Sequence, residues 1–274
     1  MIDLHLHSSA SDGALSPDEV VALAAANGVR TLALTDHDST AGLEAGAAAA
    51  ARLKLTFVPG VEVSVSWEHR TLHVVGLNID ASNDQLQAGL RELQKLRDTR
   101  AREIGRRLAK RGIPDAYAGA RALAAGADIT RTHFARHLHA NGHAKNFQDA
   151  FKRYLHLGKP AHVSVTWAAL EDCIDWIHTA GGQAVLAHPL RYPMTRSWLL
   201  RALTAFKQAG GDALEVVCGR GNRDELMQAA HLATRFELAG SVGSDFHAPG
   251  NAYLHPGGLP ELPDNIEPVW NRFH

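Results

Sequence analysis

Ile2–Ser8, which reads IDLHLHS, places two histidines one residue apart at the end of a short apolar run. A matching pattern stands near the other end of the chain, where Ser241–His247 reads SVGSDFH. Side chains alternate faces along a strand, so each i, i+2 pair projects to one side. Imidazole together with carboxylate suits divalent Mn, Fe, Zn or Ni. A closed barrel of parallel strands would bring two such distant strands to one site.

The composition limits the class of protein. A length of 274 residues with 45% hydrophobic residues allows one large domain, or a barrel with an insertion. The net charge of −1 gives no global field that would attract nucleic acid, and two cysteines give no disulfide framework. We find no signal-peptide pattern and no apolar run of 18 or more residues. We therefore expect a soluble, cytoplasmic protein without a membrane contact or an obligate protein partner.

Strand-like runs alternate with helical stretches, as in a series of βα units. The first helix is expected to start at Ser16 as N-cap, with Pro17 at the first helical position and Glu19 completing a capping box. A second helix is expected over 41–52. The expected strands are 2–7, 31–35, 55–65 (broken by Pro59-Gly60), 72–79, 183–187, 213–217 and 240–243.

The pattern changes between 81 and 158, where helix formers dominate and strand signals nearly vanish. Leu86, Leu90 and Leu93 recur there at helical spacing, as do Ile104 and Leu108. We interpret 81–158 as a helical insertion, and 1–80 with 159–274 as the barrel domain.

The unusual polar residues fall at the carboxyl ends of the expected strands, where barrel enzymes place their chemistry. A single buried histidine is usually a satisfied core residue. Seven such residues at equivalent positions predict a metal site instead. They are His5, His7, His37, Glu62, His73, His188 and Asp245.

Several short motifs follow one another along the chain: HLHS, SDG, TDHD, PGVE, HVVG, AHP and GSDFH. In these motifs and their order, the chain resembles the polymerase and histidinol phosphatase (PHP) family over nearly its whole length. The resemblance implies an α/β fold, a distorted (β/α)7 barrel with a helical lid, and phosphoester hydrolysis at two or three metal ions. The insertion and Ile129–His133, which reads ITRTH, are most similar to 3',5'-nucleoside bisphosphate phosphatases and short-RNA exonucleases.

The resemblance also implies a ligand set for each ion. The first ion takes His5, His7, Glu62 and Asp245. Glu62 bridges to a second ion, which His73 and His133 hold. The third ion takes Asp12, His37 and His247. We expect Mn²⁺, with Zn²⁺, Fe²⁺ or Mg²⁺ as alternatives. A shared carboxylate spaces two cations about 3.5–4 Å apart, which suits in-line displacement at phosphorus.

Asp12 departs from the family pattern, because many relatives have histidine at this position. The third site is therefore expected to be the weakest, and Asp12 and His37 are candidates for direct substrate contact. The alternative for Asp12 is a simple turn residue in Ser-Asp-Gly. Asp36 and Asp38, which flank His37, are interpreted as residues that orient ligands or cap the backbone.

His188 and Asp245 are the candidate catalytic residues. The resemblance suggests that His188, in Ala-His-Pro, contacts phosphate or donates a proton. The alternative is a histidine that orients a metal ligand.

The insertion supplies cations, with nine Lys or Arg and three acidic residues between Arg91 and Arg111. Most of these are expected to form a solvated helix face with i, i+4 pairs. A lid beside a phosphatase site would also use guanidinium groups to hold a second phosphate. The candidates are Arg100, Arg102, Arg131 and Lys159, with Arg136 weaker.

The favoured function is removal of the 3'-phosphate from a nucleoside 3',5'-bisphosphate, for example adenosine 3',5'-bisphosphate, by a metal-activated hydroxide. The main alternative is a 5'-3' exoribonuclease acting on short RNA, since both activities need a 5'-phosphate pocket at a fixed distance from the 3' ester. Histidinol phosphatase and a non-catalytic PHP module are further alternatives. No RNA-binding module or P-loop is visible in the sequence.

Overall fold

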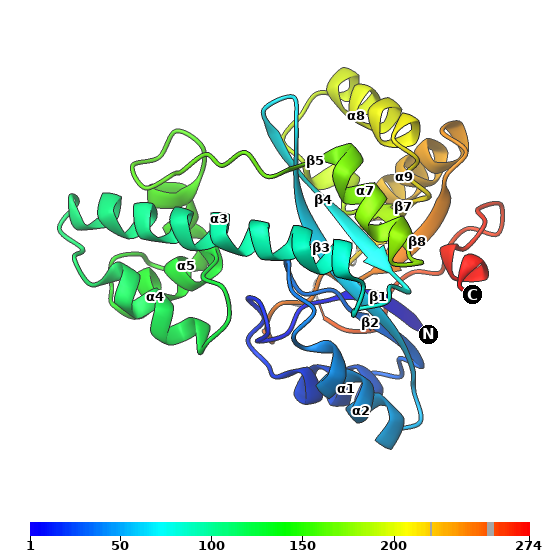
Figure 1. Ribbon diagram of the computed structural model, residues 1–274, viewed down its shortest axis with the longest axis horizontal. Helices are drawn as coiled ribbons and strands as arrows, with labels where there is room; N and C mark the ends of the chain where they lie inside the picture. The colour runs from blue at the N-terminus through cyan, green and yellow to red at the C-terminus, as the bar shows by residue number, and fades with distance from the viewer. Residues whose placement is uncertain (220, 251–254) are drawn as a thin grey trace. The chain divides into compact units, whose positions relative to one another are not determined.

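The computed structural model describes residues 1–219, 221–250 and 255–274. The chain forms two compact units (Figure 1). The barrel unit contains Met1–Leu90 and Trp167–His274, and the helical unit contains Arg91–Thr166. The insertion predicted at 81–158 has different bounds from the helical unit and stays a prediction about domain organisation.

The barrel unit is built on one mixed sheet that nearly closes on itself. Seven strands follow one another in the order β1-β2-β3-β4-β6-β7-β8, and the two-residue β5 pairs with β3. Beyond the ends of β1 and β8, His7 N donates to Phe246 O and Asp245 N donates to His5 O, each at 2.9 Å. The strands are β1 Ile2–Leu6, β2 Thr31–Leu34, β3 Thr56–Trp67, β4 Arg70–Leu77, β5 Ala168–Ala169, β6 Gln183–Leu186, β7 Ala213–Cys218 and β8 Ala239–Gly243.

Strand β4 corrects the expectation of an all-parallel barrel, because it runs antiparallel to both β3 and β6. The chain reverses in a two-residue hairpin at Glu68 and His69, whose φ angles of 46° and 61° match the twist of the flanking strands. His73 therefore stands near the start of β4 and not at its carboxyl end. It still lies at the functional edge, since it pairs with Ser64 of β3.

Strand β3 also differs from the prediction, because it continues through Pro59 and Gly60 without a break. Pro59 keeps its register with Leu34 of β2, and Gly60 pairs with Leu77 of β4. A Cβ at position 60 would lie 3.0 Å from the carbonyl oxygen of Gly76. Glycine therefore allows the strands to approach closely here, which keeps the strand continuous.

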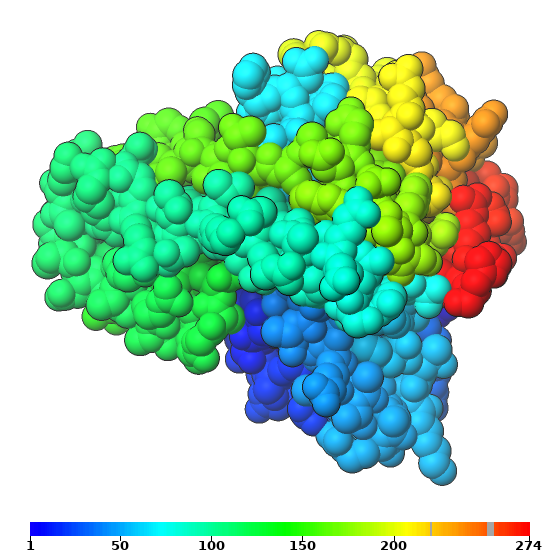
Figure 2. Space-filling model, in the orientation of Figure 1, coloured from blue at the N-terminus to red at the C-terminus, as the bar shows by residue number. Residues whose placement is uncertain are grey.

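Among the described residues, five helices of the barrel unit lie outside the sheet, and Figure 2 shows parts of α2 and α7 on the face toward the viewer. The capping box predicted at Ser16 and Glu19 is present at the start of α1. The barrel interior is filled by small and branched apolar residues, including Leu4, Val58 and Val185. The helices are α1 Pro17–Ala26, α2 Leu43–Arg52, α7 Leu170–Thr179, α8 Arg196–Gln208 and α9 Arg223–Arg235, with 3-10 turns at Pro189–Arg191 and Val269–Arg272.

The helical unit has a hydrophobic core of its own, in which Phe134, Leu108 and Leu138 are completely buried. Helix α3 begins in the barrel unit and continues into the helical unit. Among the described residues, no helix is both long and apolar enough to cross a membrane. The helices are α3 Asp84–Ala109, α4 Ala116–Ala124, α5 Arg131–Ala140 and α6 Phe147–Ala150, followed by a π-helical turn at Phe151–Leu155.

Candidate metal centre

The predicted ligands of the barrel unit gather at one edge of the sheet. His5 and His7 lie at the end of β1 and are only 1% and 0% exposed. Asp245 follows β8, and the backbone bonds between β8 and β1 bring it beside His5. Glu62 lies in β3, where it forms a parallel bridge with His37 from the loop after β2. Barrel closure therefore joins the first strand to the last, as the sequence predicted.

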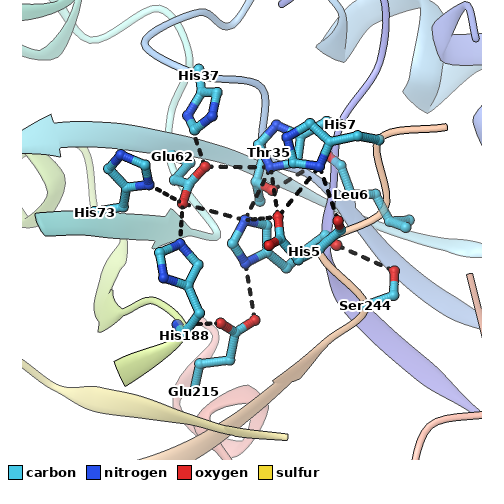
Figure 3. A network of polar contacts seen from close by, with 12 residues as sticks. His5, Leu6, His7, Thr35, His37, Glu62, His73, His188, Glu215 and Ser244 are labelled. Atoms are coloured by element: carbon cyan, nitrogen blue, oxygen red, sulfur yellow. Dashed lines mark hydrogen bonds and ion pairs between the residues drawn. The ribbon is translucent and has the colours of Figure 1, made fainter. Parts of the chain in front are cut away.

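Glu62 lies at the middle of this cluster, with imidazoles on several sides of its carboxylate (Figure 3). It is 1% exposed. Its Oε1 lies 2.9 Å from His73 Nδ1, 3.1 Å from His188 Nε2 and 3.5 Å from His5 Nε2. Its Oε2 lies 2.8 Å from His37 Nδ1 and 3.3 Å from His7 Nε2. One carboxylate is therefore shared by five histidines.

The donor atoms form three overlapping groups among the described residues. Within each group all the atoms lie within 4.8 Å of one another. His7 and His37 each belong to two groups, so the sites adjoin. The groups are His5, His7 and Asp245; His37, Glu62 and His73; and His7, Asp12, His37 and His247.

Buried donor atoms without hydrogen bonds support a fit to divalent cations. His7 Nδ1, His37 Nδ1, His73 Nδ1 and Glu62 Oε2 are buried and make no hydrogen bond with the residues described. Two of these nitrogens approach Glu62 at 2.8 and 2.9 Å, but not in hydrogen-bonding geometry. Leaving such groups unsatisfied is costly in a buried site, and a shared cation would satisfy them together. The donor set of imidazole and carboxylate suits Mn²⁺, Zn²⁺ or Fe²⁺.

The close packing of these buried groups also shifts their pKa values. Burial, together with the charge of nearby His247, lowers the pKa of His7 to about 3. Burial opposes the charge of Glu62, but His37, His73 and His5 hold the pKa of its carboxyl well below the usual range. His7 is therefore neutral and Glu62 ionised at neutral pH, which are the forms that bind metal.

Asp12 lies beside His247 with its Oδ1 3.3 Å from the imidazole Nε2, and it is 3% exposed. Asp12 thus lies in a group of residues that could hold a metal ion, and not only in a turn. Asp36 holds the preceding loop by accepting from Ser8 N at 2.8 Å and from the Ser8 and Ser11 hydroxyls at 2.6 Å. Asp38 accepts from Ser64 N at 2.7 Å. These contacts agree with the interpretation that both aspartates orient the backbone.

Two residues that contact the cluster were missed by the sequence reasoning. Glu215 of β7 lies 2.9 Å from His5 Nδ1 and accepts from the backbone N–H of His188. Tyr192 presents its hydroxyl oxygen to the backbone N–H of His73 at 2.9 Å. The only signal for Glu215 was a charged residue inside the apolar run ALEVVC, and nothing in the local sequence indicates Tyr192.

The remaining predicted residues belong to the helical unit. His133 is buried at the third position of α5, where its Nδ1 lies 3.0 Å from Thr130 N in a capping box. Its role as a ligand stays a prediction. Arg102 forms an exposed i, i+4 pair with Asp98 at 2.8 Å, and its guanidinium lies 5.4 Å from the ring of Tyr117. This favours the alternative of a solvated helix face for Arg102.

A group of cations within the helical unit contains three of the other candidates. Burial lowers the pKa of His162, and the charges of Arg131 and Arg100 lower it further. Burial likewise lowers the pKa of His156, and the charges of Arg131 and Lys159 lower it further. Arg131, Arg100 and Lys159 thus lie close to two histidines of the same unit. Phe134 is part of the core of this unit and is fully buried.

The PHP domain model matches residues 3–165 of the chain. The chain belongs to the PHP domain family. A 5'-3' exoribonuclease of Haemophilus influenzae is 47% identical over 99% of this chain and 98% of its own length. A 3',5'-nucleoside bisphosphate phosphatase of Chromobacterium violaceum is also 47% identical, over 99% of this chain and 95% of its own length. This PHP domain protein is thus equally similar to relatives with either of the two predicted activities.

Solved structures confirm the PHP fold. A structure named as an amidohydrolase from Chromobacterium violaceum, with bound sulfate and no metal, is 47% identical and has a TM-score of 0.94. It covers 99% of this chain and 95% of its own. A candidate metal-dependent phosphoesterase from Bifidobacterium adolescentis has a TM-score of 0.84 at 24% identity, over 99% and 96% of the two chains. The distorted barrel expected from the sequence is therefore confirmed.

Proposed function

We propose that this PHP domain protein is a metal-dependent phosphoesterase that removes the 3'-phosphate from nucleoside 3',5'-bisphosphates. The observation that carries the proposal is one buried carboxylate, Glu62, shared by five imidazoles at the edge of the barrel. The relative from Chromobacterium violaceum bears the name of this activity. The product from adenosine 3',5'-bisphosphate would be AMP and inorganic phosphate.

The clusters and the family resemblance together suggest the ligands of each ion. We assign His5, His7, Glu62 and Asp245 to the first ion, and Glu62 and His73 to the second, for which the resemblance also implies His133. Asp12, His37 and His247 hold the third. His37 also stands within the Glu62 and His73 group, so it is a possible additional ligand of the second ion. We propose Mn²⁺ as the native metal, because it accepts mixed imidazole and carboxylate ligands.

The bound ions would supply an ionised water as nucleophile and neutralise the phosphate oxygens. His188 lies 3.1 Å from Glu62 Oε1. Burial opposes its positive charge, but Glu62 and Asp245 raise the pKa of its imidazole above the ordinary value. A protonated His188 can donate a hydrogen bond to phosphate or a proton to the leaving 3' oxygen. Asp245, 24% exposed at its side chain, is the candidate to accept the proton of the attacking water.

The phosphate that is not cleaved requires a second set of contacts. The helical unit offers cations for this role, because Arg131 and Lys159 lower the pKa of His156, and Arg131 and Arg100 lower that of His162. Guanidinium groups bind phosphate through charge-assisted, often bidentate, hydrogen bonds. We propose that these three residues bind the 5'-phosphate of the substrate.

A second candidate function is 5'-3' exoribonuclease activity on short RNA that carries a 5'-phosphate. It is favoured by the 47% identity to the exoribonuclease of Haemophilus influenzae over nearly the whole chain. The same cluster and the same 5'-phosphate contacts would serve both reactions, since each cleaves an ester at a 3' oxygen.

A turnover screen with Mn²⁺-loaded protein tests the proposal directly. The substrates are nucleoside 3',5'-bisphosphates, dinucleotides and longer RNA with a 5'-phosphate, and histidinol phosphate. We expect the highest kcat/KM on the bisphosphate. A higher kcat/KM on RNA would favour the exoribonuclease, and turnover of histidinol phosphate alone would refute both.

A further inference from the structure

Glu215 is a buried carboxylate that connects two parts of the proposed metal centre. It is 3% exposed and stands in the middle of strand β7. Its Oε1 lies 2.9 Å from Nδ1 of His5, and its Oε2 accepts from the backbone N–H of His188 at 2.5 Å. Figure 3 shows the carboxylate on the side of His5 that faces away from Glu62. Each oxygen therefore accepts from a different strand end.

The fold makes specific room for this contact. The pairing of β7 with β8 shifts register between Glu215 and Val217, and such irregularities redirect side chains. Gly243 of β8, which pairs with Cys218, lies next to this point. A Cβ at position 243 would collide with the Cβ of His5 and lie 2.6 Å from Glu215 Oε1. Only glycine at position 243 leaves the space that the Glu215 and His5 pair occupies.

The second contact, from the backbone N–H of His188 to Glu215, stabilises a strained backbone conformation at His188. His188 has φ of 32° and ψ of 55°, a left-handed conformation that is unfavourable for a residue with a Cβ. The bond from its N–H to Glu215 helps to keep this conformation, which directs the imidazole Nε2 to within 3.1 Å of Glu62 Oε1. Glu215 thus influences His5 through its ring and His188 through its backbone.

We propose that Glu215 is a positioning residue that prepares His5 to bind metal and His188 to face the phosphate. The inference rests on the proposed metal centre. When the Nδ1–H group of His5 donates a hydrogen bond to Glu215, the lone pair of Nε2 remains available to bind the ion. Carboxylates that orient a metal-bound histidine in this way typically contribute about 10- to 100-fold in metal affinity or activity.

Glu215→Gln changes the hydrogen-bonding groups of the side chain but keeps its shape, so it tests the two contacts directly. Both oxygens of Glu215 accept hydrogen bonds, whereas glutamine offers one oxygen and one NH₂ group. One of the two donors, His5 Nδ1–H or His188 N–H, would then face another donor. We expect Mn²⁺ affinity, measured by calorimetric titration, to fall by about 10- to 100-fold.

Asp212→Asn is the matched control. Asp212 Oδ2 also joins an imidazole, His178 Nε2 at 2.8 Å, to a backbone N–H, that of Ala184 at 2.8 Å. It precedes β7, at the opposite edge of the sheet from the metal centre. We expect this variant to bind Mn²⁺ like the wild type even if its melting temperature falls. Equal Mn²⁺ affinities for Glu215→Gln, Asp212→Asn and the wild type would overturn the proposal.

A measurement on the wild type keeps the inference testable if Glu215→Gln does not fold. The ring nitrogens of His5 can be assigned by ¹⁵N NMR in chelator-treated, full-length protein. We expect the Nδ1 proton to be present and bonded to Glu215. A His5 ring protonated only at Nε2 would refute the role of Glu215. Failure of the wild type to bind Mn²⁺ at all would instead refute the proposed metal centre.

Discussion

At the residue scale, the arrangement around Glu62 explains why a strand interior contains a glutamate. A buried carboxylate without a partner costs several kcal/mol, so its position in β3 requires compensation. Five imidazoles and the proposed cations supply that compensation. The cost of folding the residue inside the barrel is thus offset by its use as a shared ligand.

Glu62→Gln should remove the shared ligand while preserving size. An amide carries no negative charge to hold two cations together, so we expect at least one equivalent of Mn²⁺ fewer than in the wild type by elemental analysis. The loss of several kcal/mol of charge stabilisation predicts a decrease in kcat of about 10³-fold. A Mn²⁺ content equal to that of the wild type would contradict the assignment of Glu62 as the bridge.

Binding of the third ion should weaken as the pH falls. Burial opposes the charge of His247, but Asp12 and Asp245 raise the pKa of its imidazole to about 10. His247 must lose a proton before it can bind metal, so below pH 10 affinity should rise about tenfold per pH unit. Mn²⁺ titrations at pH 7, 8 and 9 would measure this, with the third ion filled last at pH 7.

Asp12→His provides the control for that prediction. It removes the carboxylate whose charge favours protonated His247, and it supplies an imidazole ligand in its place. We expect the third equivalent to bind at pH 7 with a weaker dependence on pH. An unchanged titration would show that Asp12 does not belong to the third site.

The candidate ligands of the barrel unit could be found from the sequence because their signal is local. His5 and His7 form an i, i+2 pair within one strand, and the same holds for Asp245 and His247 after another. Glu215 could not be predicted in the same way. Its partners depend on the register of β7 and on the space left by Gly243, which are properties of strands that meet only in the fold.

At the element scale, the chain follows its local signals wherever capping and turn chemistry are explicit. The start of α1 was predicted from Ser16, Pro17 and Glu19, and the structure contains the full capping box. The direction of β4 was not predictable, because its hairpin uses Glu68 and His69 in place of the Asn-Gly or Asp-Gly pair that usually signals such a turn.

Ser16→Ala should destabilise the barrel unit by removing the side chain that accepts from Glu19 N. The usual cost of losing an N-cap is about 1 kcal/mol, which corresponds to a decrease of roughly 2–4 °C in melting temperature for a domain of this size. Thr195→Ala is the matched control, because Thr195 is the N-cap residue of α8 but makes no capping bond through its side chain. A decrease as large for Thr195→Ala would show that the capping bond is not the cause.

At the scale of the whole molecule, the two units divide the proposed work. The barrel unit contains the donor clusters and His188. The helical unit contains Arg131, Arg100 and Lys159, which are not needed to bind metal ions at the ends of the strands. The division suggests that chemistry and substrate choice are separable, because contacts to the uncleaved phosphate contribute to binding a bisphosphate but not a simple phosphate ester.

Arg131→Ala tests this separation. A charge-assisted bond to phosphate contributes about 1.5–3 kcal/mol, which corresponds to roughly 10- to 150-fold in kcat/KM. We expect a loss of that order on a nucleoside 3',5'-bisphosphate and almost none on an aryl phosphate, which has no second phosphate. Arg106→Ala is the matched control, since Arg106 is exposed and paired with Glu103. It should change neither rate. The decisive quantity is the ratio of the two losses for Arg131→Ala, because equal losses would assign Arg131 to the metal centre or to the fold.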